Sequence, residues 1–290
     1  MPDPTHHFFD APEARVSYYE WGPKDGPAVL MIHATGFHAR VFDQTIKHLP
    51  DGWRIVSVDQ RGHGRSTAPG PIQSWAEPPL DIAPLISHLD LKDIIGVGHS
   101  MGGHTLTQLA HQMPERFKAL VLLDPVIRDP NSYGFQLPPP FDKAETHPIA
   151  RRRSDWPSVE AFFERLKDHE PYSFWTTDAL WDYCRHGLLP KDGGFELACP
   201  GVIEASVYVS SSSLSLHDIV GEITQPVTVV RAKQGGVMDG GKMDFSISPT
   251  WVELANHFPN GRDIFRPDLT HFIPMQDPEF SAQMIKDAAA

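Results

Sequence analysis

The sequence is poor in cysteine and has no long hydrophobic run. Its 290 residues include only Cys184 and Cys199, which fit no CxxC spacing. At most one disulfide bond could form, so we expect a reducing compartment and a fold without covalent cross-links. No apolar run approaches the roughly 18 residues of a membrane-spanning helix. The first ten residues show no basic segment followed by an apolar one, so no signal peptide is expected. These absences predict a soluble, cytoplasmic protein without a membrane partner.

Positive charge is also scarce. Twenty-five Lys and Arg residues stand against 37 Asp and Glu residues, which gives a formal net charge of −12. A field of this sign repels phosphate backbones, so we expect no nucleic-acid partner. The composition is that of an ordinary globular protein, and the length allows one large domain or two small ones. The sequence does not decide between a monomer and a homo-oligomer.

Short apolar runs alternate with longer amphipathic stretches along most of the chain. Runs typical of strands occupy residues 15–21, 28–33, 54–58, 94–98, 119–123, 227–230 and 263–265. Stretches of helical length occupy residues 39–49, 80–89, 101–112, 249–258 and 278–286. Strand alternating with helix predicts the α/β class, with a mostly parallel sheet covered by helices on both faces.

One long segment, residues 127–217, interrupts this alternation. It has no strand-like run, and its large aromatic residues include Trp156, Phe162, Phe163, Tyr172, Phe174, Trp175, Trp181 and Tyr183. A structureless loop of this length is uncommon. We therefore expect a mainly helical inserted segment (residues 127–217), with residues 1–126 and 218–290 forming the core. The basic run at 151–153 is more consistent with a solvated face than with an anion site.

The strongest chemical signal lies at residues 98–102, which read GHSMG. They fit G-x-S-x-G between a strand run and a helical stretch, the context in which this motif carries a nucleophile on a sharp turn. Glycines are needed there because neighbouring side chains would collide with strand and helix. Ser100 is therefore the candidate nucleophile. The alternative is a serine that only caps the helix.

Four segments together resemble the α/β-hydrolase family. Besides the GHSMG turn they are HATG at 33–36, DQRGHGRS at 59–66, and THF at 270–272. The second matches the family pattern D-x-R-G-x-G-x-S in full. The resemblance covers nearly the whole chain and implies the α/β-hydrolase fold with an eight-stranded sheet. It also implies that the inserted segment is a cap over the active site, and it implies no cofactor.

A serine hydroxyl needs a base to take its proton. Among 16 histidines, the resemblance points to His271, in the loop after the last strand run. His99 and His33 are expected to have structural roles. No spacing of the HExxH kind occurs, so we expect no metal site.

The acid that orients the histidine departs from the common family pattern. That acid usually follows the seventh strand, but residues 230–235 read VRAKQG, and the next carboxylate is Asp239. Asp124 ends the sixth strand run, where haloalkane dehalogenases and some lactone-cleaving relatives carry their acid. We predict Asp124, with Asp239 as the alternative and Asp244 and Asp268 less favoured. Asp124 could otherwise be a cap on the following segment.

An oxyanion formed at Ser100 requires two backbone amides. One is expected from Met101, directly after the nucleophile. The family places the other in the loop after His33, and we assign it to Thr35, with its neighbour Gly36 as the alternative.

The identity of the nucleophile indicates the class of reaction. Relatives that open epoxides or displace halide carry aspartate at this turn, so Ser100 favours acyl chemistry. We expect a hydrolase that cleaves a carboxylic ester or lactone of a bulky apolar small molecule. Alternatives on the same triad are a carbon–carbon bond hydrolase for β-diketones and a cofactor-free haloperoxidase. A non-catalytic ligand-binding protein is the third interpretation.

Overall fold

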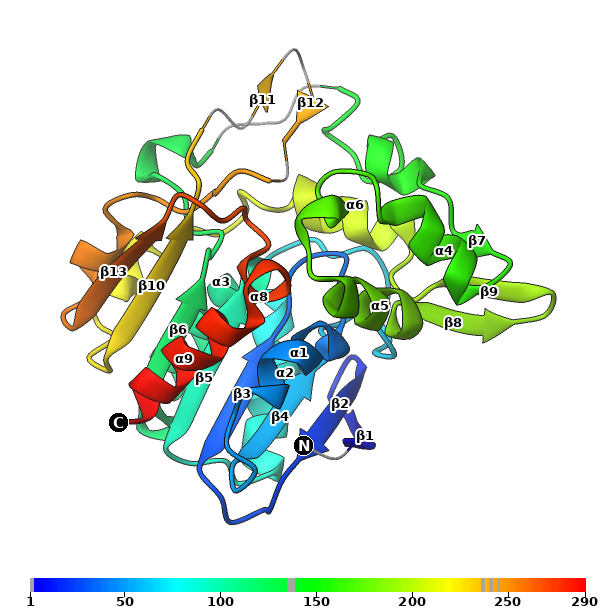
Figure 1. The fold of residues 1–290 in the computed structure, drawn as a ribbon. Helices are drawn as coiled ribbons and strands as arrows, with labels where there is room; N and C mark the ends of the chain where they lie inside the picture. The colour runs from blue at the N-terminus through cyan, green and yellow to red at the C-terminus, as the bar shows by residue number, and fades with distance from the viewer. Residues whose placement is uncertain (1–2, 135–138, 236–237, 240–241, 245) are drawn as a thin grey trace.

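A twisted eight-stranded sheet forms the centre of the computed structural model, which describes residues 3–134, 139–235, 238–239, 242–244 and 246–290 (Figure 1). The strand order is β1-β2-β4-β3-β5-β6-β10-β13. β1 pairs antiparallel with β2 and β2 with β4, and the remaining pairs are parallel. The strands are β1 (Thr5–Asp10), β2 (Arg15–Trp21), β3 (Ala28–Ile32), β4 (Arg54–Val58), β5 (Ile94–His99), β6 (Phe117–Leu123), β10 (Val227–Ala232) and β13 (Gly261–Arg266). The predicted mostly parallel sheet is confirmed.

Helices cover both faces of this sheet because its buried strands are apolar on both faces. Val29 and Met31 of β3 belong to one buried apolar cluster, whereas Leu30 and Ile32 belong to another. This alternation follows from the two-residue period of a strand. The first cluster packs against α1 (Asp43–Lys47) and α9 (Pro278–Ala289), and the second against α2 (Glu77–His88) and α3 (Met101–Gln112).

The inserted segment contains both helices and strands. Its helices are α4 (Val159–Leu166), α5 (Thr177–His186) and α6 (Gly201–Val209). A small antiparallel sheet, which we did not predict, joins β7 (Asp155–Trp156), β9 (Gly194–Leu197) and β8 (Leu188–Lys191). These strands have two to four residues, too few for a periodic pattern to be recognised. Figure 1 shows these elements grouped in green and yellow at one end of the main sheet.

The inserted segment packs tightly on the core. Trp156, Phe162 and Tyr183 belong to the same buried cluster as Met31 and Phe37 of the core. Most of the aromatic residues that the sequence places in this segment therefore stabilise its packing.

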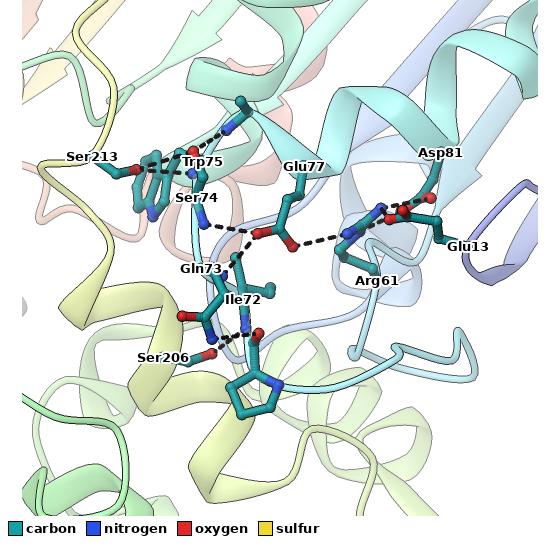
Figure 2. Close-up of polar contacts among 12 residues, drawn as sticks. Glu13, Arg61, Ile72, Gln73, Ser74, Trp75, Glu77, Asp81, Ser206 and Ser213 are labelled. Carbon is teal, nitrogen blue, oxygen red and sulfur yellow. Dashed lines mark hydrogen bonds and ion pairs between the residues drawn. The ribbon is translucent and has the colours of Figure 1, made fainter.

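Helix α6 is fastened to a core loop by hydrogen bonds (Figure 2). The Ile72 amide donates to Ser206 Oγ over 2.8 Å, and the Trp75 amide donates over 3.0 Å to Oγ of Ser213, in the segment that follows α6. The Trp75 indole donates to the Val207 carbonyl. Because these contacts involve backbone groups of both partners, α6 has a defined position over the core.

The remaining elements are short. They are α7 (His217–Val220), α8 (Ile273–Gln276), and the antiparallel pair of β11 (Met238–Asp239) and β12 (Lys242–Met243). The helix expected at 249–258 was wrong, since only a 3₁₀ turn at Leu254–His257 forms there. Both cysteines are buried and free. Within the described part of the chain, no helix has the length and apolar character needed to cross a membrane.

Candidate active site

Ser100 lies on the sharp turn between β5 and α3. Its backbone has φ 57° and ψ −119°, a region that costs energy for a residue with a side chain. The glycines on either side are required by space. A Cβ at Gly102 would lie 2.0 Å from the Ile32 carbonyl oxygen, and one at Gly98 would lie 2.5 Å from the Gly102 carbonyl oxygen. The G-x-S-x-G pattern therefore follows from how closely α3 approaches β3 and β5.

His271 lies in the loop between β13 and α8, and its ring reaches Ser100. His271 Nε2 is 2.9 Å from Ser100 Oγ. The loop backbone is held on both sides: the His271 amide donates to the Ser246 carbonyl, and His99 Nε2 lies 2.7 Å from the His271 carbonyl oxygen. A carbonyl only accepts, so Nε2 of His99 carries the proton. His99, the residue directly before Ser100, thus holds the His271 loop in place.

Asp124 follows β6 and completes the hydrogen-bonded chain. Its Oδ2 is 2.6 Å from His271 Nδ1. Its Oδ1 accepts from the Ala232 amide at 3.0 Å, Ser248 Oγ at 2.5 Å and Thr250 Oγ1 at 3.1 Å. Asp124 is fully buried, and a buried carboxylate is costly unless such donors surround it.

The other candidate acids have different surroundings. The Asp244 carboxylate bonds to Ser246, and Asp268 pairs with Arg266. The backbone of Asp239 lies in β11, and its side chain is outside the described residues. The donors Ser248 and Thr250 were not predicted, because no motif marks them and only the folded chain brings them to Asp124.

The two predicted oxyanion positions adjoin each other beside Ser100. Met101 begins α3, and Thr35 lies in the loop after β3. Thr35 Oγ1 is 3.7 Å from Met101 Sδ, and both residues are buried. The structure thus places the Thr35 loop next to the first turn of α3.

His33 organises this loop. Its Nε2 accepts from the Gln60 amide at 3.0 Å, while the Gln60 side chain donates to the His33 carbonyl at 2.7 Å. The Nδ1–H donates to the Ala34 carbonyl. Burial keeps the pKa of His33 well below its usual value, so the neutral ring can donate at one nitrogen and accept at the other.

The DQRGHGRS segment supports the same region. Asp59 accepts from the amides of Ala39 and Arg65 at 2.6 and 2.9 Å. A Cβ at Gly64 would lie 2.2 Å from the Asp59 carboxyl carbon, so this position requires glycine. Arg61 is almost fully buried and pairs with Asp81 through two nitrogens.

A second contact of Arg61 extends this support toward α6. Arg61 donates to Glu77 at 2.9 Å, and Glu77 accepts from the amides of Gln73 and Ser74 (Figure 2). The loop that holds α6 is therefore tied to the DQRGHGRS segment.

One group of side chains could approach a cation. Within the described residues, ligand atoms of Asp43, Asp182 and His186 lie within 4.8 Å of one another. Arg40 already pairs with Asp43 at 2.6 Å, and Gln44 Nε2 donates to Asp182 Oδ2 at 2.5 Å. Asp43 is thus paired within its own segment, and Asp182 belongs to the packing between α1 and α5.

Known proteins resemble this chain in sequence and structure. The family model described as "alpha/beta hydrolase fold" matches residues 27–146. A non-heme chloroperoxidase of Streptomyces lividans is 33% identical over 135 residues, which are 46% of this chain and 45% of that protein. A bifunctional esterase/perhydrolase of Acinetobacter calcoaceticus is 28% identical, with 91% of this chain and 92% of that protein covered.

Structural similarity extends over the whole chain. The crystal structure of E-2-(acetamidomethylene)succinate hydrolase superposes with a TM-score of 0.76 at 21% identity, covering 99% of each chain. The eight-stranded sheet, the serine turn and these matches lead to one assignment: the chain has the α/β-hydrolase fold.

Proposed function

We propose that this protein is a serine hydrolase that cleaves a carboxylic ester or lactone through an acyl-enzyme. The observation that carries the proposal is the continuous chain from Ser100 Oγ through His271 to Asp124, with separations of 2.9 and 2.6 Å. A serine bonded to a histidine that is oriented by a carboxylate is the arrangement of an activated nucleophile.

The geometry suggests a role for each group. His271 Nε2 takes the Ser100 proton as Oγ attacks the carbonyl carbon, and Asp124 stabilises the imidazolium that forms. The amides of Met101 and Thr35 donate to the oxyanion. His271 then returns the proton to the leaving oxygen. Water attacks the acyl-enzyme, and its proton passes through His271 back to Ser100.

The surroundings of Met101 support a bulky apolar substrate. A buried apolar cluster joins Met101 to Ile203 and Val207 of α6, and to Ile72 and Trp75 of the core. We propose that the acyl group or the alcohol group packs along this cluster, with the inserted segment acting as a cap. In support, Ser100 is only 5% exposed.

A serine-directed phosphonate tests the nucleophile. Intact-protein mass spectrometry should show one adduct on the wild type and none on Ser100→Ala, because the activated Oγ displaces the phosphonate's leaving group. Ser87→Ala, an exposed serine on α2, should label like the wild type. If folded wild type is not labelled by a methyl-sized phosphonate, the proposal is wrong.

Two similarities favour a second candidate, a perhydrolase or haloperoxidase activity at the same triad. The relatives described above include a chloroperoxidase and an esterase/perhydrolase. Hydrogen peroxide would replace water, attack the acyl-enzyme and release a peracid while the Ser100 hydroxyl is restored. Assays with and without peroxide distinguish hydrolysis, which gives the carboxylic acid, from perhydrolysis, which gives the peracid. Formation of both products should be lost in Ser100→Ala. A ketone plus an acid, rather than an alcohol plus an acid, would instead indicate carbon–carbon bond cleavage.

A further inference from the structure

Arg152 differs from its two basic neighbours. Arg151 and Arg153 are exposed, as expected for a solvated face, but the Arg152 side chain is only 21% exposed. Its guanidinium forms an ion pair with Glu204 of α6 and lies 3.3 Å from the Tyr183 hydroxyl. The expectation of a wholly solvated basic run was therefore wrong for its middle residue.

The carboxylate of Glu204 lies directly against the Thr35 loop. A Cβ at Gly36 would be 2.6 Å from Glu204 Oε1, and Gly36 has φ +77°. The preceding residue of α6, Ile203, approaches Gly62 in the same way, with Cγ2 2.6 Å from a Cβ there. Helix α6 therefore lies against two core loops at glycines whose positive φ angles, +77° and +71°, favour glycine.

This placement has an electrostatic consequence. The largely buried carboxylate of Glu204 lies beside Gly36, the residue that follows Thr35. It would repel a developing oxyanion, because charge–charge energies grow in a poorly solvated site. The guanidinium of Arg152 compensates this charge. A buried carboxylate that loses its cationic partner is also costly in itself.

We propose that Arg152 and Glu204 are a positioning pair for the oxyanion site. Glu204 braces the loop at Gly36, and Arg152 neutralises Glu204 so that the braced loop can receive negative charge. This inference rests on the proposed function, since it concerns the oxyanion formed at Ser100.

Four variants test the pair: Arg152→Gln, Glu204→Gln, the double variant, and Arg151→Gln as the control. Arg152→Gln should lower kcat by about 10- to 100-fold, with KM changed by no more than about threefold. The double variant should restore kcat to near the wild-type value, because neither charge of the pair is then left without its partner. Arg151→Gln should behave like the wild type.

A second readout separates electrostatics from packing. A trifluoromethyl ketone adds Ser100 Oγ at its carbonyl carbon and becomes an oxyanion while His271 takes the proton. Its affinity should fall with kcat in Arg152→Gln and be regained in the double variant. A purely structural role would lower the unfolding temperature without this rescue. If Arg152→Gln does not fold, the comparison of kcat between the double variant and the wild type still decides.

Specific outcomes contradict the inference. Equal kcat for Arg152→Gln and Arg151→Gln overturns it, as does a double variant whose kcat is about tenfold or more below that of the wild type. In both cases an active wild type with a labelled Ser100 leaves the proposed function intact. A wild type that neither hydrolyses esters nor forms the ketone adduct contradicts both proposals.

Discussion

Two residues of the candidate triad have unusual backbone conformations. Ser100 has φ 57° and Asp124 has φ 47°, and both conformations carry a steric cost. The surrounding hydrogen bonds offset that cost. The Asp124 amide donates to the Val230 carbonyl over 2.7 Å, while the Val126 amide donates to the Ser100 carbonyl over 3.1 Å. Strain at two residues therefore places their side chains on either side of His271.

The choice of acid can be tested at this scale. Asp124→Asn should lower kcat about 10⁴-fold with little change in KM, because an amide cannot hold His271 in the tautomer that accepts the Ser100 proton. Asp239→Asn should leave both constants within about threefold of the wild type. Steady-state kinetics on one ester measures both. A silent Asp124→Asn beside an inactive Asp239→Asn would reverse the assignment.

At the scale of elements, the nucleophile depends on how closely α3 meets β3. Gly102 is the point of contact, where a Cβ would lie 2.0 Å from the backbone oxygen of Ile32. A backbone atom cannot rotate away as a side chain can. Any larger residue must therefore move the helix away from the sheet.

Gly102→Ala should accordingly destabilise the protein. We expect the free energy of unfolding to fall by about 3 kcal/mol, within the range of overpacked cores. Gly70→Ala is the matched control, since no described atom lies within 4 Å of a Cβ there. It should change stability by no more than about 0.5 kcal/mol. Urea unfolding measures both, and equal midpoints would show that α3 tolerates the displacement.

Across the whole molecule, buried neutral histidines link stability to pH. Burial lowers the pKa of His38, His99 and His104 to about 3 and that of His63 to about 4. In the unfolded chain these rings take up protons near pH 6.5. Their contribution to stability is therefore present above pH 6.5 and is lost as the pH falls toward 4. Asp43, whose pKa burial raises to about 6, acts in the opposite direction.

A variant isolates one histidine from these opposing groups. Removing His104 should flatten the pH dependence of the unfolding free energy by up to about 1.4 kcal/mol per pH unit between pH 4 and 6. The test compares urea unfolding of the wild type and His104→Gln at several pH values, with the exposed His88→Gln as the control. Parallel curves for wild type and His104→Gln would show that His104 is not held neutral.

The sequence by itself determined the features that depend on neighbouring residues. The run of apolar residues before GHSMG and the helical stretch after it placed Ser100 between β5 and α3, and α3 has the predicted bounds, Met101–Gln112. Position along the alternating pattern placed His271 after the last strand. Local patterns were less reliable where elements are short or exposed. β7, β8 and β9 were missed, as was β1, whose residues are mostly solvent-facing.

Only the tertiary structure decided which distant residues meet. Asp124 and His271 are 147 positions apart, and Ser248 and Thr250 reach Asp124 from a segment without a strand pattern. The inward turn of Arg152 likewise depends on Glu204, 52 positions away. A periodic pattern reports which face of an element is buried. The partner of a buried charge is set by how the elements pack, because the cost of burial is offset only where a donor or an opposite charge lies within reach.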